Sequence, residues 1–380
     1  MPDKLIPLPS FAWIAVTSKC NLSCGHCQRK LLLQQGLISK KEMSAGVFGK
    51  LEKELIPSLK RIQFGGNNFG EQLFASHWDD IFARVTKFNI DISLVSNATL
   101  VSSERLNAMI DAGVEFNFSL EGISDETYAS VRGCDFKTYF LTVSEACRKK
   151  SGSRARVNLG FTAMRDNVTE IPRLLKTAAE LGVDRVTITH FVPWEEDQRQ
   201  QSLVYHKDIA NRMLNEARAL AGEYNLLVDL PLPFSINETR EHENRSDDAT
   251  SLPPCYHPWE SVSINERGEV MPCCASSAIM GSLEDSSFST IWNNRKYQKL
   301  RKTVNSSRPL SFCRQCGLRG IEVGGMKPLS FCSDEDLLLG GIGKTAQNSS
   351  FKTTLSKYRI GRKLIPHLMQ FYRKHAAFIR

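Results

Sequence analysis

The sequence predicts an α/β protein built around a partial, six-unit (β/α) barrel that resembles a TIM barrel. Short, mostly apolar and β-branched runs alternate with longer helical patterns from residue 11 to about residue 230. This alternation is typical of βαβ units on a parallel sheet. Cysteines and polar residues follow several of the runs directly. Functional groups gather in this way at the carboxyl ends of barrel strands.

Six runs are expected to form the strands, and each is short and mostly apolar, as buried parallel strands are. They are residues 11–17, 61–64, 90–95, 115–120, 157–163 and 185–190. Helical stretches are expected between them at residues 41–59, 103–112 and 168–181. Gly113 and Gly182 follow the second and third stretches, where a helix commonly ends in glycine.

Changes in composition divide the chain into four expected parts. Residues 1–235 form the barrel, 236–252 a polar linker, 253–332 a small cysteine-rich domain with a β-hairpin, and 333–380 an amphipathic basic helical tail. The tail has nine Lys or Arg and no Asp or Glu after Gly340, so the rest of the chain is nearly neutral. The tail either packs its apolar stripe on the barrel or binds an anionic membrane surface or partner.

The composition excludes several classes of protein. With 41% hydrophobic and 24% charged residues over 380 positions, the chain resembles ordinary soluble proteins. It has no apolar run of about 18 residues that could span a bilayer and no apolar export signal at its start. We therefore expect a cytoplasmic protein, associated with membranes at most peripherally through the tail. The near-neutral body gives no reason to expect a nucleic-acid partner.

The eleven cysteines point to metal ligation or redox chemistry, because thiols in the cytosol are kept reduced. Cys20, Cys24 and Cys27 follow the first expected strand with C-x3-C-x2-C spacing. Three thiolates on a short loop can hold three irons of a [4Fe–4S] cluster and leave the fourth iron open. That iron can chelate the amino and carboxylate groups of S-adenosylmethionine. The alternative is zinc with His26 as fourth ligand, although His26 adjoins Cys27 directly, which makes shared tetrahedral ligation awkward.

Over residues 11 to about 320, which include this loop, the sequence resembles the radical S-adenosylmethionine (radical SAM) superfamily. Residues 65–73 resemble the family's glycine-rich Gly-Glu-Pro segment, residues 96–98 its Thr-Asn-Gly, and residues 119–122 its Ser-x-Asp-Gly. An arginine within Val-Arg-Gly matches one that reaches the methionyl carboxylate in relatives. The resemblance implies that S-adenosylmethionine is bound by Gly70, Glu71, Asn97, Ser119, Glu121 and Arg132.

Four positions depart from the family pattern. Gln72 replaces the proline, Ala98 the glycine of Thr-Asn-Gly, and Glu121 the aspartate of Ser-x-Asp-Gly. His26 stands where an aromatic residue usually packs near adenine. These departures put the individual contacts in doubt, whereas the order of the segments at successive strand ends carries the family resemblance.

A second group of cysteines resembles the C-terminal SPASM domain, or its shorter twitch form. It includes a Gly-x4-Cys hairpin and comprises Cys255, Cys273, Cys313 and Cys316. The resemblance implies one auxiliary [4Fe–4S] cluster with four thiolates, because the C-x5-C-x3-C continuation of a full SPASM domain is missing. A zinc ribbon is the alternative.

Three further cysteines, Cys134, Cys274 and Cys332, have no role in either cluster. Most such cysteines are small buried hydrophobic residues. In some relatives, however, a thiol returns a hydrogen atom to the substrate radical. Each of the three is therefore a candidate catalytic residue.

The resemblance implies an oxidoreductase-type radical SAM enzyme. It would take an electron from a flavodoxin- or ferredoxin-type reductant, cleave S-adenosylmethionine to a 5′-deoxyadenosyl radical and abstract a substrate hydrogen atom. Because the barrel begins almost at residue 11, we expect a sugar- or aminocyclitol-like small molecule as the substrate, for oxidation or epimerisation. The alternatives are a ribosomal-peptide or protein maturase with the same chemistry and, from another class, a non-catalytic iron–sulfur electron carrier or sensor.

Overall fold

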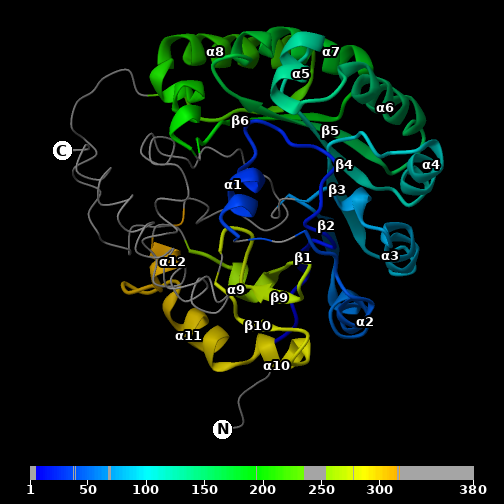
Figure 1. The fold of residues 1–380 in the computed structure, drawn as a ribbon, viewed down its shortest axis with the longest axis vertical. Helices are drawn as coiled ribbons and strands as arrows, with labels where there is room; N and C mark the ends of the chain where they lie inside the picture. Colours follow the sequence, from blue (N-terminus) through cyan, green and yellow to red (C-terminus); the bar gives the residue numbers. More distant parts are fainter. Residues whose placement is uncertain are drawn as a thin grey trace.

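The computed structural model describes residues 6–36, 38, 40–66, 70–193, 195–234, 254–276, 278–314 and 316. A ten-stranded sheet runs through these residues in the order β10-β9-β8-β1-β2-β3-β4-β5-β6-β7. Figure 1 shows helices α2 to α8 along the outside of the curved sheet and α1 near its centre. The predicted linker and tail, like Cys332, lie outside the described residues.

Seven parallel strands form the barrel part of the sheet. They are β1 (Phe11–Ile14), β2 (Arg61–Phe64), β3 (Asp91–Ser96), β4 (Glu115–Leu120), β5 (Arg156–Ala163), β6 (Arg185–His190) and β7 (Leu227–Asp229). On the other side of β1, strand β8 (Ser261–Ile264) pairs in parallel, and β9 (Glu269–Met271) and β10 (Gly281–Ser282) follow antiparallel. The predicted fold class, a parallel α/β barrel followed by a hairpin-bearing region, is therefore confirmed.

Twelve helices accompany the strands within the described ranges. They are α1 (Gln28–Gln34), α2 (Ala45–Glu54), α3 (Trp78–Val85), α4 (Ser103–Asp111), α5 (Asp125–Arg132), α6 (Phe136–Lys149), α7 (Ile171–Leu181), α8 (Lys207–Glu223), α9 (His257–Glu260), α10 (Phe288–Trp292), α11 (Arg295–Thr303) and α12 (Ser311–Arg314). No helix in this part of the chain is both long and apolar enough to span a bilayer. Side chains cap several starts, as where Ser102 accepts from the N–H of Arg105 and Asp135 from that of Thr138, which satisfies otherwise unpaired donors.

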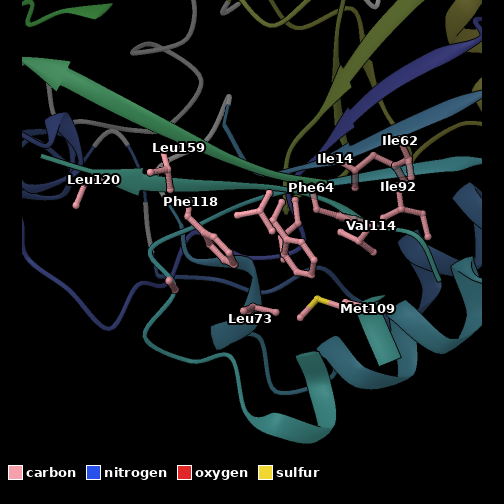
Figure 2. Close-up of a cluster of buried hydrophobic side chains, with 14 of the residues drawn as sticks. Ile14, Ile62, Phe64, Leu73, Ile92, Met109, Val114, Phe118, Leu120 and Leu159 are labelled. Carbon is pink, nitrogen blue, oxygen red and sulfur yellow. The ribbon is translucent and has the colours of Figure 1, made fainter. Parts of the chain in front are cut away.

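The main core lies between the sheet and the outer helices. Figure 2 shows Phe64 of β2 and Phe118 of β4 on the side of the sheet that faces Met109 of α4. The opposite face of the strands is polar: Arg61 Nη2 lies 2.7 Å from Glu115 Oε2, and Asn158 Nδ2 donates to Glu115 Oε1 over 2.9 Å. The alternation places polar groups inside the barrel, as the two-residue period of strands requires.

Strand β1 is shorter than the predicted 11–17, because the side chain of Gln72 binds the backbone after Ile14. Gln72 Oε1 accepts from the N–H groups of Val16 (2.7 Å) and Thr17 (3.4 Å), and its Nε2 donates to the carbonyl of Gly70 (3.2 Å). Gln72 is completely buried. Gly70 passes so close to Thr17 that an added Cβ would clash with the Thr17 carbonyl oxygen. The residue that replaces the family's proline thus joins two loops.

We predict that Gln72→Ala lowers the free energy of unfolding by about 1–3 kcal/mol, because it leaves buried backbone N–H groups without a partner. Anaerobic urea unfolding of the full chain measures the change. Gln298→Ala is the control, since Gln298 is exposed and its loss should change stability by less than about 0.5 kcal/mol. Equal effects of the two substitutions would contradict the role of Gln72.

Candidate active site

One cavity, of about 180 Å³, brings the first three cysteines together with the polar ends of several strands. Cys20, Cys24 and Cys27 lie in the loop between β1 and α1 and contribute to its lining. The strand ends and α5 contribute Gly66, Gly70, Glu71, Ser96, Asn97, Ser119 and Arg132. The cavity thus collects all but one of the residues expected to contact S-adenosylmethionine. The exception, Glu121, does not line the cavity but pairs with Arg132.

The three thiols fit a site for a metal cluster that is bound by thiolates. Burial raises the pKa of Cys20 and Cys27, while backbone N–H groups of Leu22 and Arg29 oppose the rise by donating to these sulfurs. The Arg132 guanidinium donates to the Cys24 sulfur over 3.5 Å. Donors directed at a sulfur favour the thiolate, which is the form that binds metal. Within the described ranges no three Cys, His, Asp or Glu side chains are arranged to hold a single metal ion.

The buried carboxylate of Glu71 ties the loop after β2 to the end of β3. It accepts from the backbone N–H of Asn97 (2.7 Å), the hydroxyl of Ser96 (3.0 Å) and the N–H of Leu73 (3.4 Å). Burial raises the pKa of Glu71, and the same donors counteract the rise. Asn97 Nδ2 in turn donates to Asn21 Oδ1 over 3.0 Å, so the cysteine loop is fixed relative to β3.

Ala98 occupies a backbone conformation that favours glycine. Its φ is 65° and its side chain is completely buried. A non-glycine residue there is strained by about 1–2 kcal/mol. The departure from the family's Thr-Asn-Gly therefore changes the residue type while retaining the left-handed turn.

Glu121 and Arg132 form a buried ion pair beside the cavity. Arg132 Nε lies 2.5 Å from Glu121 Oε2, and both side chains are less than a tenth exposed. Arg132 Nη2 also donates to the carbonyl of Ser119 over 2.6 Å, and Thr162 donates to Glu121 Oε1 over 3.2 Å. The charge of Arg132 is therefore balanced within the protein.

His26 points toward this pair instead of completing a ligand set with the cysteines. Its Nε2 lies 3.8 Å from Glu121 Oε1, and its ring meets Phe191 edge-on with 6.4 Å between centroids. Burial lowers the pKa of His26, although the Glu121 carboxylate opposes the shift. Burial thus disfavours the charged form of the imidazole.

A second, smaller cavity holds the later cysteines. Its volume is about 30 Å³ and its lining includes the five thiols Cys255, Cys273, Cys274, Cys313 and Cys316 together with apolar side chains such as Leu300, Val304 and Phe312. Burial raises the pKa of Cys273 well above its ordinary value and that of Cys274 to about 12. Cys274 was not expected to lie with the other four thiols. Its only signal was adjacency to Cys273.

The two cavities lie toward opposite ends of β1. The first follows the carboxyl end of β1, whereas β9 runs back along β8 with Met271 opposite Ser263. Cys273 is therefore near the start of β8, which pairs with the start of β1 at Phe11. The cavities share no lining residue.

Of the three candidate catalytic thiols, none lines the first cavity within the described part of the chain. Burial raises the pKa of Cys134, while Tyr128 and Arg132 oppose the rise. Cys274 lies in the second cavity, and Cys332 is outside the described residues. A catalytic role for any of them stays a prediction.

Comparisons with protein families match both parts of the chain. The family model described as the radical SAM superfamily matches residues 14–164. The model described as SPASM, an iron–sulfur cluster-binding domain, matches residues 255–317. The first contains the loop with Cys20, Cys24 and Cys27, and the second contains all five thiols of the second cavity.

Curated relatives match over nearly the whole chain. The PqqA peptide cyclase of Gluconobacter oxydans is 24% identical over 391 residues, covering 97% of this chain and 99% of that protein. The PqqA peptide cyclase of Bradyrhizobium diazoefficiens is 23% identical, over 87% and 84% of the two chains. The tungsten-containing aldehyde ferredoxin oxidoreductase cofactor-modifying protein of Pyrococcus furiosus is 22% identical, over 81% and 87%.

Solved structures share the fold. SuiB of Streptococcus suis, bound to S-adenosylmethionine, has a TM-score of 0.58 and 15% identity, covering 86% of this chain and 76% of SuiB. The structure of anSMEcpe with bound AdoMet has a TM-score of 0.57 and 14% identity, covering 87% and 96%. Both proteins also have structures with a peptide bound.

The expected small-molecule substrate is wrong in view of these relatives, which favour the peptide alternative. The expectation relied on the start of the barrel near residue 11. The peptide-bound form of anSMEcpe, of which 96% aligns with 87% of this chain, shows that a chain of this layout accommodates a peptide. The position of the first strand therefore does not restrict the substrate.

We predict that Glu121→Gln lowers the free energy of unfolding by about 3–5 kcal/mol, because it leaves Arg132 buried without a counter-charge. Glu52→Gln is the matched control: Glu52 also lies 2.5 Å from an arginine, Arg84, but both side chains are about a quarter exposed, where a pair contributes about 0–1 kcal/mol. Urea unfolding under anaerobic conditions distinguishes the two. If both variants lost a similar amount of free energy of unfolding, burial of the Glu121–Arg132 pair would not be what makes Glu121→Gln destabilising.

Proposed function

This chain belongs to the radical SAM superfamily and carries a C-terminal SPASM iron–sulfur domain, and from this we propose that it modifies a peptide substrate. The enzyme uses a [4Fe–4S] cluster with S-adenosylmethionine and an auxiliary iron–sulfur cluster. The observation that carries the peptide proposal is the alignment with the Gluconobacter PqqA peptide cyclase over nearly the full length of both proteins. The peptide-bound structures of SuiB and anSMEcpe support it at the level of the fold.

In this proposal the first cavity is where S-adenosylmethionine is cleaved. Cys20, Cys24 and Cys27 hold the cluster. When bound, the cluster and S-adenosylmethionine supply one-electron chemistry that removes a hydrogen atom from the substrate. The loop of Gly70 and Glu71 presents backbone carbonyls to the methionyl ammonium, and its position depends on the Glu71 bonds to Ser96 and Asn97.

Arg132 acts mainly through the residues that it holds. Its guanidinium is committed to Glu121, to the Ser119 carbonyl and to the sulfur of Cys24. It therefore positions the end of β4 against the cysteine loop. This assignment differs from direct pairing with the methionyl carboxylate, since each of its three nitrogens is already directed at a protein atom.

The second cavity would hold the auxiliary cluster through Cys255, Cys273, Cys313 and Cys316. Four thiolates can complete a four-iron cluster, so no iron needs a substrate ligand. Removal of a hydrogen atom followed by loss of a proton and one electron oxidises a substrate by two electrons. An auxiliary cluster held by these four thiolates would supply an acceptor for that electron, and the reaction would then be oxidoreductase-type. A flavodoxin- or ferredoxin-type protein would supply the first electron.

The test uses the full chain, reconstituted anaerobically with iron and sulfide and reduced with dithionite. Short peptides translated from reading frames beside the gene serve as substrates. We expect 5′-deoxyadenosine to form together with a peptide product that has lost two hydrogens, as measured by mass spectrometry. The triple replacement of Cys20, Cys24 and Cys27 by Ala should abolish both products.

Two results would contradict the proposal. Uncoupled 5′-deoxyadenosine with every peptide, but turnover of a small molecule, would reject the peptide substrate. Persistence of 5′-deoxyadenosine formation in the triple variant would reject the assignment of the first cavity.

A further inference from the structure

Arg29 is a buried cation without an acidic partner. It is the second residue of α1 and is 7% exposed. Its Nε donates to the carbonyl of Ser18 over 2.9 Å, whereas its Nη2 is buried and has no hydrogen-bond partner. Across the described residues, no carboxylate forms an ion pair with Arg29. A guanidinium in this state requires an anion nearby, because an uncompensated buried charge is strongly unfavourable.

An anion bound in the first cavity would be near Arg29, because Arg29 lines this cavity together with Cys20 and Cys27. Burial raises the pKa of both thiols, and the positive charge of Arg29 opposes that rise. The other buried arginine of the cavity, Arg132, gives the contrast: its counter-charge is Glu121, at 2.5 Å. Arg29 therefore supplies the unbalanced positive charge, and it lies beside the thiols.

We propose that Arg29 is the buried counter-cation of the iron–sulfur cluster held by Cys20, Cys24 and Cys27, and that it makes reduction of this cluster more favourable. A [4Fe–4S] cluster with three thiolate ligands is anionic, and the incoming electron adds a further negative charge. A fixed cation that is itself shielded from solvent, as Arg29 is, stabilises the more negative state more strongly than the less negative one. Arg29 is thus a positioning residue that acts on the cluster's potential.

The test compares the midpoint potential of this cluster in the wild type, Arg29→Gln and Arg29→Lys, without S-adenosylmethionine. In a redox titration monitored by EPR, only assembled clusters give a signal. The midpoint potential can therefore be measured even in a variant that holds less iron. We expect the Arg29→Gln cluster to be about tenfold harder to reduce, which is about 59 mV for one electron. Arg29→Lys should retain most of the wild-type potential because it keeps the charge.

Two controls accompany the titration. Lys30→Gln removes a positive charge from the next residue, which also lines the cavity but is exposed, and should shift the potential little because solvent screens it. The auxiliary cluster of each variant should keep its potential, since Arg29 does not line the second cavity.

An unchanged potential in Arg29→Gln would overturn the proposal. If that variant bound S-adenosylmethionine more weakly at an unchanged potential, the guanidinium would pair with the methionyl carboxylate and the proposal would be wrong. The inference depends on the proposed function for the cluster at the first three cysteines. The two failures can be told apart. A wild-type chain without a cluster signal would reject the proposed function, whereas an unchanged potential in Arg29→Gln would reject only the role of Arg29.

Discussion

Parallel pairing of β1 with β2, of β2 with β3 and of β3 with β4 places the carboxyl ends of four strands at one edge of the sheet, and the first cavity depends on this placement. The residues involved are separated by up to about a hundred positions in the chain, yet hydrogen bonds between their loops fix them. Gln72 binds the backbone after β1, and Glu71 binds the end of β3. Both side chains are buried, so these bonds are formed where water cannot replace them, and losing them would leave unpaired donors.

The charges around this cavity are unevenly balanced. Arg132 is paired with Glu121, and burial lowers the pKa of His26. The thiols and Arg29 are complementary groups: three sulfurs that become anionic on binding iron, and one buried cation that forms no ion pair among the described residues. This arrangement favours an anionic cluster at the cysteine loop. The second cavity contrasts with it, since its thiols lie among apolar side chains and close to one another.

The sequence was sufficient to predict the barrel, the two groups of cysteines and most of the polar strand ends, because these features follow from local periodicity and fixed spacing. Strand β7 was not predicted, since Leu227–Asp229 is too short to show a period. The contacts of Gln72, the pairing of Glu121 with Arg132 and the isolation of Arg29 arise from tertiary packing and have no local signal. The presence of Cys274 in the second cavity also arises from tertiary packing, because the segment after β9 folds back toward α12. The substrate was predicted wrongly, because the start of the barrel does not determine what the cavity admits.

In the proposed function, S-adenosylmethionine binds to iron at the first cavity alone. The most direct measurement is the EPR spectrum of the reduced protein before and after S-adenosylmethionine is added, in the wild type and in a variant with Cys313 and Cys316 replaced by Ala. Because the two cavities share no lining residue, S-adenosylmethionine should change the spectrum of one cluster in the wild type and change it in the same way in the variant. A spectrum that does not respond, or a response that disappears with Cys313 and Cys316, would show that S-adenosylmethionine does not bind at the first cavity alone.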